Sequence, residues 1–195
     1  MNKDPITHLL QEHKAIMAQV DDLREAVEQL TRHGESALPK TLPVFHQISQ
    51  MMAGQLDLHR RKEDDVFFPA VEAFIGMHGP TDVMRQEHRD IHAQGVLLRE
   101  TLRELNKEQH PAIEAGAEKL RELVANGSNA EALRRTGEEI IYLLDAHFAK
   151  EENILFPIVR ELLDATVLND ISRQFEAMEI AATSAKASQV EIQSP

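Results

Sequence analysis

The stretch HRRKEDDVFFP at residues 59–69 recurs as HFAKEENILFP at residues 147–157, so the pattern H-x-x-x-E-[DE]-x-[VI]-[FL]-F-P occurs twice in the chain. A shorter pair of segments, QEHKAI at residues 11–16 and QEHRDI at residues 86–91, precedes the two copies. The order of one histidine followed by His-x-x-x-Glu therefore repeats along the sequence. This internal repeat predicts two structurally equivalent halves.

The spacing within each copy indicates metal ligands. Residues four apart on an α-helix differ by about 40° in direction and about 6 Å in height, so each histidine and its glutamate face one place. Imidazole nitrogens and carboxylate oxygens that converge inside a helical bundle are ligands for transition metals. Two such pairs and two single histidines are sufficient for two ions with bridging carboxylates. The candidate ligands are His13, His59, Glu63, His88, His147 and Glu151.

Composition favours a single helical domain whose metal site uses nitrogen and oxygen ligands. The chain has 195 residues, of which 42% are hydrophobic and only 4% aromatic, a balance with little β-strand character. It contains no cysteine, which excludes disulfides, Cys-ligated zinc and iron–sulfur clusters.

Apolar residues at alternating spacings of three and four predict the helices. The first helix begins at Asp4-Pro5 and ends at His33-Gly34, and His13 is the only polar residue on its apolar face. Further helices are expected from Thr41 to Pro69, from Thr81 onward, and through the second motif copy. Between residues 106 and 126 an insertion predicts an extra short helix that begins at Pro111. A last helix is expected to be capped by Asn169 or Asp170. The apolar face of the first helix contains Ile6, Leu9, Ile16, Val20, Leu23, Val27 and Leu30.

The expected fold class is all-α: an up-down four-helix bundle built from two duplicated helical hairpins, with extra short helices. We assign residues 1–165 to this domain, residues 166–183 to a C-terminal helix packed on the bundle, and residues 184–195 to a flexible tail. Ser49 and Gly137 occupy equivalent places in the two halves, and their small size predicts a close approach of helices.

Charge and hydropathy indicate the class of partner and the cellular location. A net charge of −12 disfavours binding to nucleic acid. The N-terminus has no signal-peptide pattern, and no apolar run is long enough to span a membrane. We therefore expect a cytoplasmic protein, a monomer or small homo-oligomer, without a nucleic-acid or membrane partner. The sequence contains no phosphate-binding loop and no nucleophile triad.

The histidines and glutamates are better explained by a metal than by a polar core network. A single histidine on an apolar face is usually a hydrogen-bonded core residue, but here four occupy equivalent positions. A buried carboxylate costs several kcal/mol unless it is paired or metal-bound. Glu63 and Glu151 lie on apolar faces without a lysine or arginine. A polar network, or a site that has lost its metal, is the alternative.

The motifs over roughly residues 5–165 resemble those of the hemerythrin-like family, also called HHE cation-binding domains. The resemblance implies a non-haem centre of two iron ions, with Glu63 and Glu151 as bridges, the histidines as terminal ligands, and an oxo or hydroxo bridge. It also implies binding or sensing of a small diatomic ligand, O₂ or NO. The alternatives are a di-iron enzyme acting on NO or peroxide, an iron-centre repair protein, or an iron sensor. Repair proteins of this kind typically carry a further, cysteine-containing domain, so we favour that alternative less.

Several further residues allow two interpretations. Oxygen-carrying hemerythrins have a fifth histidine four residues after the third-helix histidine, where His92 stands, but its counterpart in the first half is Met17. His92 is therefore either an iron ligand or a partly exposed histidine. Gly95 serves close helix packing or leaves space for a ligand. Glu12 and Glu87 are interpreted as solvated charges, because adjacent helix positions point about 100° apart.

The remaining side chains of interest are assigned to a shell or to the surface. We expect a dry shell around the irons, which limits access to small gases. Its members are Val66, Phe68, Ile154 and Phe156. The histidines that do not repeat between the halves are interpreted as surface residues. These are His8, His33, His46, His78 and His110.

Overall fold

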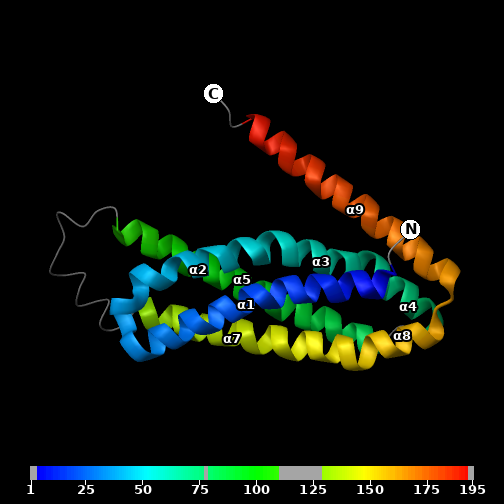
Figure 1. Cartoon of the computed structure of the whole chain (residues 1–195), viewed down its shortest axis with the longest axis horizontal. Coiled ribbons are helices and arrows are strands. Elements are labelled where there is room, and N and C mark those ends of the chain that lie inside the picture. Colours follow the sequence, from blue (N-terminus) through cyan, green and yellow to red (C-terminus); the bar gives the residue numbers. More distant parts are fainter. Residues whose placement is uncertain (1–3, 77–78, 110–128, 193–195) are drawn as a thin grey trace. The chain divides into compact units, whose positions relative to one another are not determined.

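The computed structural model of the chain describes residues 4–76, 79–109 and 129–192. All regular structure within these ranges is helical (Figure 1), and the predicted all-α helical bundle with extra short helices is confirmed. No described helix combines the length and apolar character that crossing a membrane requires. The described residues include neither His78 nor His110, nor the helix that is predicted to begin at Pro111.

The helices follow the internal repeat, and both motif copies contain a π-helical turn. The first half consists of α1 (Pro5–His33), the 3₁₀ turn η1 (Gly34–Ala37), α2 (Leu38–Met51), the π turn η2 (Met52–Leu56), α3 (Asp57–Lys62), the π turn η3 (Glu63–Phe67) and α4 (Phe68–Ile75). Within its described residues, the second half contains α5 (Pro80–Gln109), α7 (Asn129–Lys150), the π turn η4 (Glu151–Leu155), α8 (Phe156–Leu162) and α9 (Ala165–Ile192).

The ends of α1 are those that the sequence predicts. The backbone N–H of Thr7 donates to Asp4 Oδ2 at 2.9 Å, which is an N-cap hydrogen bond. Gly34 follows the helix with φ of +55°, a conformation that glycine adopts without strain. Every predicted apolar residue of this helix is at most 7% exposed, so its apolar face is confirmed as core.

α2 begins three residues before the predicted start near Thr41, and the predicted cap of the last helix was wrong. α2 begins at Leu38 rather than at Thr41, because Pro39 is suited to a first turn. α9 begins at Ala165, and its cap is Asp164, whose Oδ1 accepts the N–H groups of residues 166 and 167 at 2.8 and 3.0 Å. α9 also extends to Ile192, beyond the predicted end at residue 183. Its sequence contains no glycine or proline that would stop it earlier.

The chain forms two compact units. Unit 1 contains residues 1–15, 54–88 and 147–195, and unit 2 contains residues 16–53 and 89–146. Unit 1 contains all six repeated histidines and glutamates and an apolar cluster from α1, η3, α4, α5, η4, α8 and α9. Its buried members are Ile6, Leu9, Val66, Phe67, Phe68, Val71, Met84, Leu155, Phe156, Val159, Leu163, Ile171 and Phe175.

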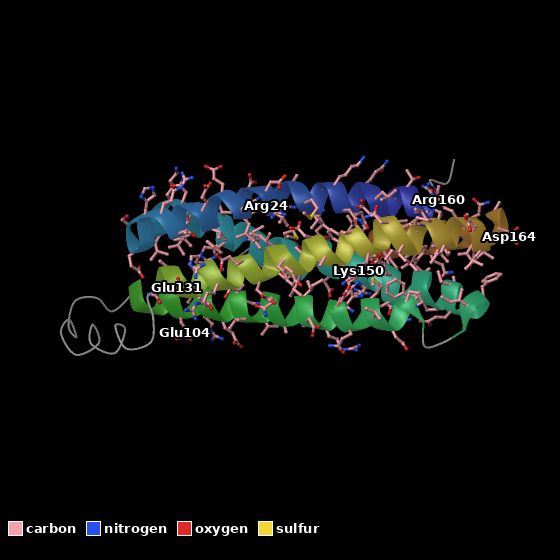
Figure 2. The ribbon with its side chains drawn as sticks, turned by 90° about the horizontal axis from the view of Figure 1, so that it is seen from below. Arg24, Glu104, Glu131, Lys150, Arg160 and Asp164 are labelled. Atoms are coloured by element: carbon pink, nitrogen blue, oxygen red, sulfur yellow. The ribbon has the colours of Figure 1, made fainter. Side chains whose placement is uncertain are left out.

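Unit 2 packs its helices closely at two glycines. A Cβ at Gly137 would lie 2.6 Å from Val27 Cγ2, and a Cβ at Gly95 would lie 3.2 Å from Met52 Cε. Both glycines therefore serve helix packing, which supports the first interpretation of Gly95. At the surface of the unit, Arg24, which is labelled in Figure 2, donates to Asp145 at 2.5 Å.

Candidate metal centre

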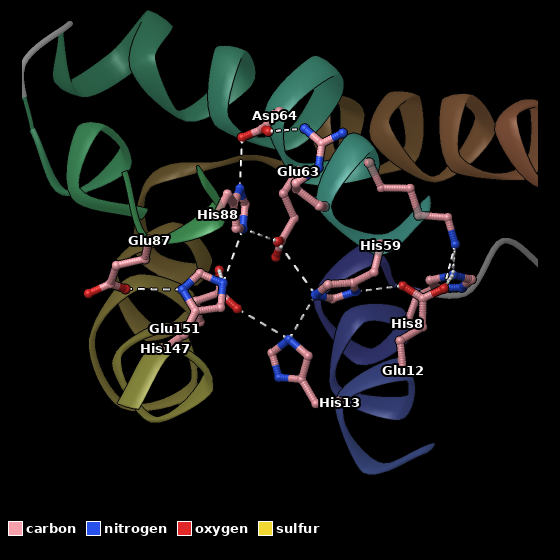
Figure 3. A network of polar contacts seen from close by, with 12 residues as sticks. His8, Glu12, His13, His59, Glu63, Asp64, Glu87, His88, His147 and Glu151 are labelled. Carbon is pink, nitrogen blue, oxygen red and sulfur yellow. Dashed lines mark hydrogen bonds and ion pairs between the residues drawn. The ribbon is translucent and has the colours of Figure 1, made fainter. Parts of the chain in front are cut away.

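The six candidate ligands meet inside unit 1. No side chain of the six is more than 4% exposed, and Figure 3 shows them turned toward a common centre. The residues come from six elements. They are His13 on α1, His59 on α3, Glu63 at the start of η3, His88 on α5, His147 on α7 and Glu151 at the start of η4.

The ligand atoms form two groups that share both glutamates, and the atoms of each group lie within 4.8 Å of one another. We call the group with His13 and His59 half-site A; their Nε2 atoms are 3.2 Å apart. The group with His88 and His147 is half-site B, and its Nε2 atoms are 3.1 Å apart. The internal repeat of the sequence thus becomes a pair of equivalent half-sites.

The two glutamates each contact both half-sites. Glu63 Oε2 lies 3.5 Å from His59 Nε2 of half-site A and 3.2 Å from His88 Nε2 of half-site B. The carboxylate of Glu151 makes the equivalent contacts, at 3.2 and 3.3 Å, to the other histidine of each half-site. Carboxylates in this position are suited to bridge two cations.

Each histidine also contacts a second carboxylate through Nδ1, at 2.9 or 3.0 Å. Such a partner fixes the ring orientation and tautomer of a ligand histidine and makes it more basic. The interpretation of Glu12 and Glu87 as solvated charges was therefore wrong. Both turn away from the histidine that follows them in the chain and reach the histidine of a neighbouring helix. The pairs are His13–Glu152, His59–Glu12, His88–Asp64 and His147–Glu87.

The centre contains buried acceptors without donors. All four rings direct Nε2 toward the centre and Nδ1 toward a carboxylate, so a neutral ring that donates its Nδ1 hydrogen presents the lone pair of Nε2 to the centre. The four carboxylate oxygens of Glu63 and Glu151 are also buried, and none accepts a hydrogen bond from the part of the chain that the structure describes. Each unsatisfied buried acceptor costs about 1–3 kcal/mol. Donor atoms about 3 Å apart suit metal–ligand bonds of about 2.1 Å, so the donor set fits two transition-metal ions.

Burial and the facing charges shift the pKa values of the two glutamates in opposite directions. Burial, and then the carboxylate of Glu151, raise the pKa of Glu63 well above its ordinary value. Burial also opposes ionisation of Glu151, but His147 and His13 outweigh it and lower the pKa. Burial lowers the pKa of His59 to about 4, so this imidazole is in the neutral, ligating form near pH 7.

The prolines that end both motif copies explain the π turns. Pro69 lacks an amide hydrogen, and in an α-helix its ring clashes with the carbonyl group four residues earlier. The preceding turn is widened instead, so that the Phe68 N–H bonds to the Glu63 carbonyl five residues back. The second copy has the same geometry before Pro157. π turns of this kind are frequent at functional sites.

The acidic residue after each bridging glutamate belongs to the same arrangement. Glu63 and Asp64 contact opposite nitrogens of His88, at 3.2 Å from Nε2 and 2.9 Å from Nδ1. The corresponding residues of the second copy hold His13 at the same two distances. The [DE] position of the motif is therefore the sequence signal for the orienting carboxylates Asp64 and Glu152. The Gln-Glu-His repeat is the signal for Glu12 and Glu87.

Basic side chains support the orienting carboxylates. Lys62 Nζ donates to Glu12 Oε1 at 2.6 Å. Lys150 occupies the same place in the second copy and donates to Glu87. Asp64 accepts hydrogen bonds from two arginine side chains. The lysine before the glutamate in both motif copies was the signal for this layer, and sequence reasoning missed it.

The predicted apolar shell is present except at one position. Phe68 and Phe156 are buried, and each ring centroid lies 5.6 Å from that of a ligand histidine. Val66 is buried because α9 packs against η3, whereas Ile154 at the equivalent place is 54% exposed, so its assignment to the shell was wrong. Phe148, which was not predicted, stacks on His13 with centroids 3.9 Å apart.

The structure does not bring His92 to the centre. Its side chain is exposed, and neither metal-binding group includes it. Of the histidines predicted at the surface, His33 is exposed and His46 is half-buried. His8 is only 20% exposed and contacts Lys62, so its interpretation as a surface residue was wrong.

Comparison with known proteins identifies the family of the chain. The family model of the hemerythrin HHE cation-binding domain matches residues 4–123 and, in a second match, residues 101–184. A curated relative, the iron-sulfur cluster repair protein YtfE of Edwardsiella ictaluri (strain 93-146), is 31% identical over 154 residues. The match covers 78% of this chain and 61% of that protein, so the chain spans less than two thirds of its relative's length.

Proposed function

This chain belongs to the family of hemerythrin HHE cation-binding domains, and on that premise we propose that it binds two iron ions that interact with O₂ or NO. The observation that carries the proposal is the set of buried, unsatisfied oxygens of Glu63 and Glu151 between four histidines. Such a set is stable when cations occupy it. Iron is preferred over zinc on the basis of the family, since imidazole and carboxylate suit both metals.

The residues of each half-site would hold one ion. Half-site A offers His13 and His59, half-site B offers His88 and His147, and both glutamates serve both ions. Four protein donors leave coordination positions for a small ligand, since iron accepts up to about six. Ferrous iron supplies electrons that a bound diatomic ligand can accept.

The protein's own side chains favour a small ligand in a dry site. The orienting carboxylates hold each imidazole with its lone pair toward the centre, so little reorganisation accompanies metal binding. Phe68, Phe148 and Phe156 cover the ligand rings and exclude water. A shell of this kind admits O₂ or NO more readily than a large organic substrate.

Iron-sulfur cluster repair is the second candidate. The relative from Edwardsiella ictaluri is named an iron-sulfur cluster repair protein, and the 31% identity to it extends over most of this chain. In this function the di-iron centre would release iron to a damaged cluster. An enzyme acting on NO or peroxide would use the same centre.

The test of iron binding is anaerobic loading with Fe²⁺ followed by elemental analysis and optical spectroscopy. We expect close to two irons per chain and, after oxidation, near-ultraviolet charge-transfer bands of a bridged di-ferric centre. Zinc alone, or no metal after reconstitution, contradicts the proposal.

The same loaded protein separates the candidate functions. Spectra that change and recover through cycles of O₂ or NO indicate a carrier or sensor. Consumption of excess NO or H₂O₂ indicates an enzyme. Loss of iron from the protein with recovery of clusters in an iron-depleted acceptor indicates repair.

A further inference from the structure

The two equivalent lysines of the motif copies lie in different environments. Both lysines donate a hydrogen bond to an orienting carboxylate, Lys62 to Glu12 and Lys150 to Glu87. Lys62, however, is completely buried. The side chain of Lys150, which is labelled in Figure 2, is 41% exposed. Burial of one lysine but not the other breaks the equivalence of the half-sites.

The helix α9 causes this difference. Glu179 on α9 accepts a hydrogen bond from Lys62 Nζ at 2.7 Å, and the ammonium lies 5.7 Å from the centroid of the Phe175 ring, also on α9. His8 completes the surroundings with its Nε2 at 2.9 Å from Lys62 Nζ and 3.0 Å from Glu179 Oε1. A buried ammonium is stable only with such partners.

An unbroken chain of polar contacts joins half-site A to α9. His59 directs Nε2 toward the centre and donates from Nδ1 to Glu12 Oε2 at 2.9 Å (Figure 3). The other oxygen of Glu12 accepts from Lys62 at 2.6 Å, and Lys62 in turn donates to Glu179. Glu12 is therefore held by a ligand histidine on one side and by the α9-bound lysine on the other.

The docking of α9 has two parts. Phe175 is 1% exposed and belongs to the apolar cluster of unit 1, which holds the first half of the helix. Glu179 lies one turn farther along, and its side chain is 41% exposed. Its contact with Lys62 is thus the polar attachment at the edge of the docked region, and it can be removed without disturbing the apolar cluster.

We propose that Lys62 and Glu179 are positioning residues for half-site A, and that docking of α9 and metal binding at His59 stabilise each other. The inference rests on the proposed function in that it requires a metal ion in the centre. Such coupling is reciprocal. An ion that orders His59 and Glu12 therefore strengthens the attachment of α9, and loosening of α9 weakens the binding of the ion to half-site A. Half-site B has Lys150 exposed and serves as the internal control.

The test uses the full-length protein and three variants. Glu179→Gln weakens the attachment of α9 without touching Glu12, Lys62→Met removes the cation, and Lys150→Met is the matched control in the second copy. Binding of Fe²⁺ under anaerobic conditions, and separately of Zn²⁺, is measured by competition with a chelator. Hydrogen exchange over residues 171–183 is measured with and without each metal.

We expect Glu179→Gln to weaken the binding of one of the two metal ions by about 3- to 10-fold. Loss of a residue that hydrogen-bonds directly to a metal-binding side chain typically costs about 10- to 100-fold in metal affinity, and Glu179 is farther away. Metal should protect residues 171–183 in the parent and Lys150→Met proteins, and much less in Glu179→Gln and Lys62→Met. If Lys62→Met fails to fold, Glu179→Gln alone decides.

Two results overturn the inference: unchanged metal affinity together with unchanged protection of α9 in Glu179→Gln, or an equal loss of α9 protection in Lys150→Met, whose own lysine supports Glu87 and not α9. Failure of the proposed function is a separate result. If the parent protein binds Zn²⁺ but not Fe²⁺, the iron function is wrong, while the coupling is still decided by Zn²⁺. If neither metal binds, both are wrong.

Discussion

Unit 1 and unit 2 share the helices α1, α5 and α7 but bury different kinds of side chain. In unit 2 the helices approach at Gly95 and Gly137, and a buried polar group such as Thr41 Oγ1 donates to a local carbonyl, that of Ala37, at 3.1 Å. In unit 1 the carboxylates of Glu63 and Glu151 are buried without hydrogen-bond donors among the described residues. Among the described residues, the buried polar side chains of unit 2 therefore have hydrogen-bond partners within the protein, whereas unit 1 contains buried carboxylate oxygens that could bind a cation.

Removing a bridging carboxylate should have the largest effect. Glu63→Ala or Glu151→Ala takes an anionic ligand from both half-sites, so we expect loss of at least one metal ion per chain by elemental analysis. Asp65→Ala, an exposed change in the same π turn as Glu63, is the control and should retain both ions. Two ions and unchanged spectra in both glutamate variants would show that these carboxylates do not bridge.

Removing the metal should destabilise unit 1 more than unit 2. A ligand present at 100 times its dissociation constant stabilises the native state by about 2.7 kcal/mol, so the apo-protein should stay helical but melt at a lower temperature. Hydrogen exchange should accelerate in residues 55–67 and 147–155 and change little in residues 20–30. Equal protection of all three segments with and without metal would mean that the site is preformed and contributes nothing to folding.

Substitution of Gly137 should affect unit 2 regardless of metal. The added methyl group of Gly137→Ala would lie 2.6 Å from Val27 Cγ2, and overpacking of this kind costs about 1–3 kcal/mol. Gly54→Ala is the matched control, because a Cβ at Gly54 meets no atom within 4 Å. It should be neutral or stabilise by up to about 1 kcal/mol through helix propensity. Chemical denaturation measures the free energy of unfolding of both variants. An unchanged free energy of unfolding in Gly137→Ala would mean that the helices separate at little cost.

Substitution of His92 should have the smallest effect. Because the side chain is exposed and outside both half-sites, His92→Ala should bind two metal ions with the spectrum and oxidation rate of the parent protein. His88→Ala, which removes a buried ligand of half-site B, is the positive control and should lose metal. A changed spectrum in His92→Ala would restore the five-histidine interpretation.

The sequence alone determined the elements whose causes are local. Apolar spacing predicted α1 to the residue, since it depends only on the helical period and on the cap at Asp4. The His-x-x-x-Glu spacing identified the four residues of the two motif copies that converge in the centre, because residues four apart share a helix face. The repeat of a histidine before each copy identified His13 and His88.

Only the tertiary structure decided what surrounds the ligands. A direction about 100° away from His13 on α1 leads to the neighbouring helix that carries His59, and not to solvent, so Glu12 could not be assigned from its own helix. The exposure of Ile154 and the burial of Lys62 likewise depend on where α9 packs. The physical reason is that helical periodicity fixes the directions of side chains on one helix, while their partners are fixed by the helices that pack against it.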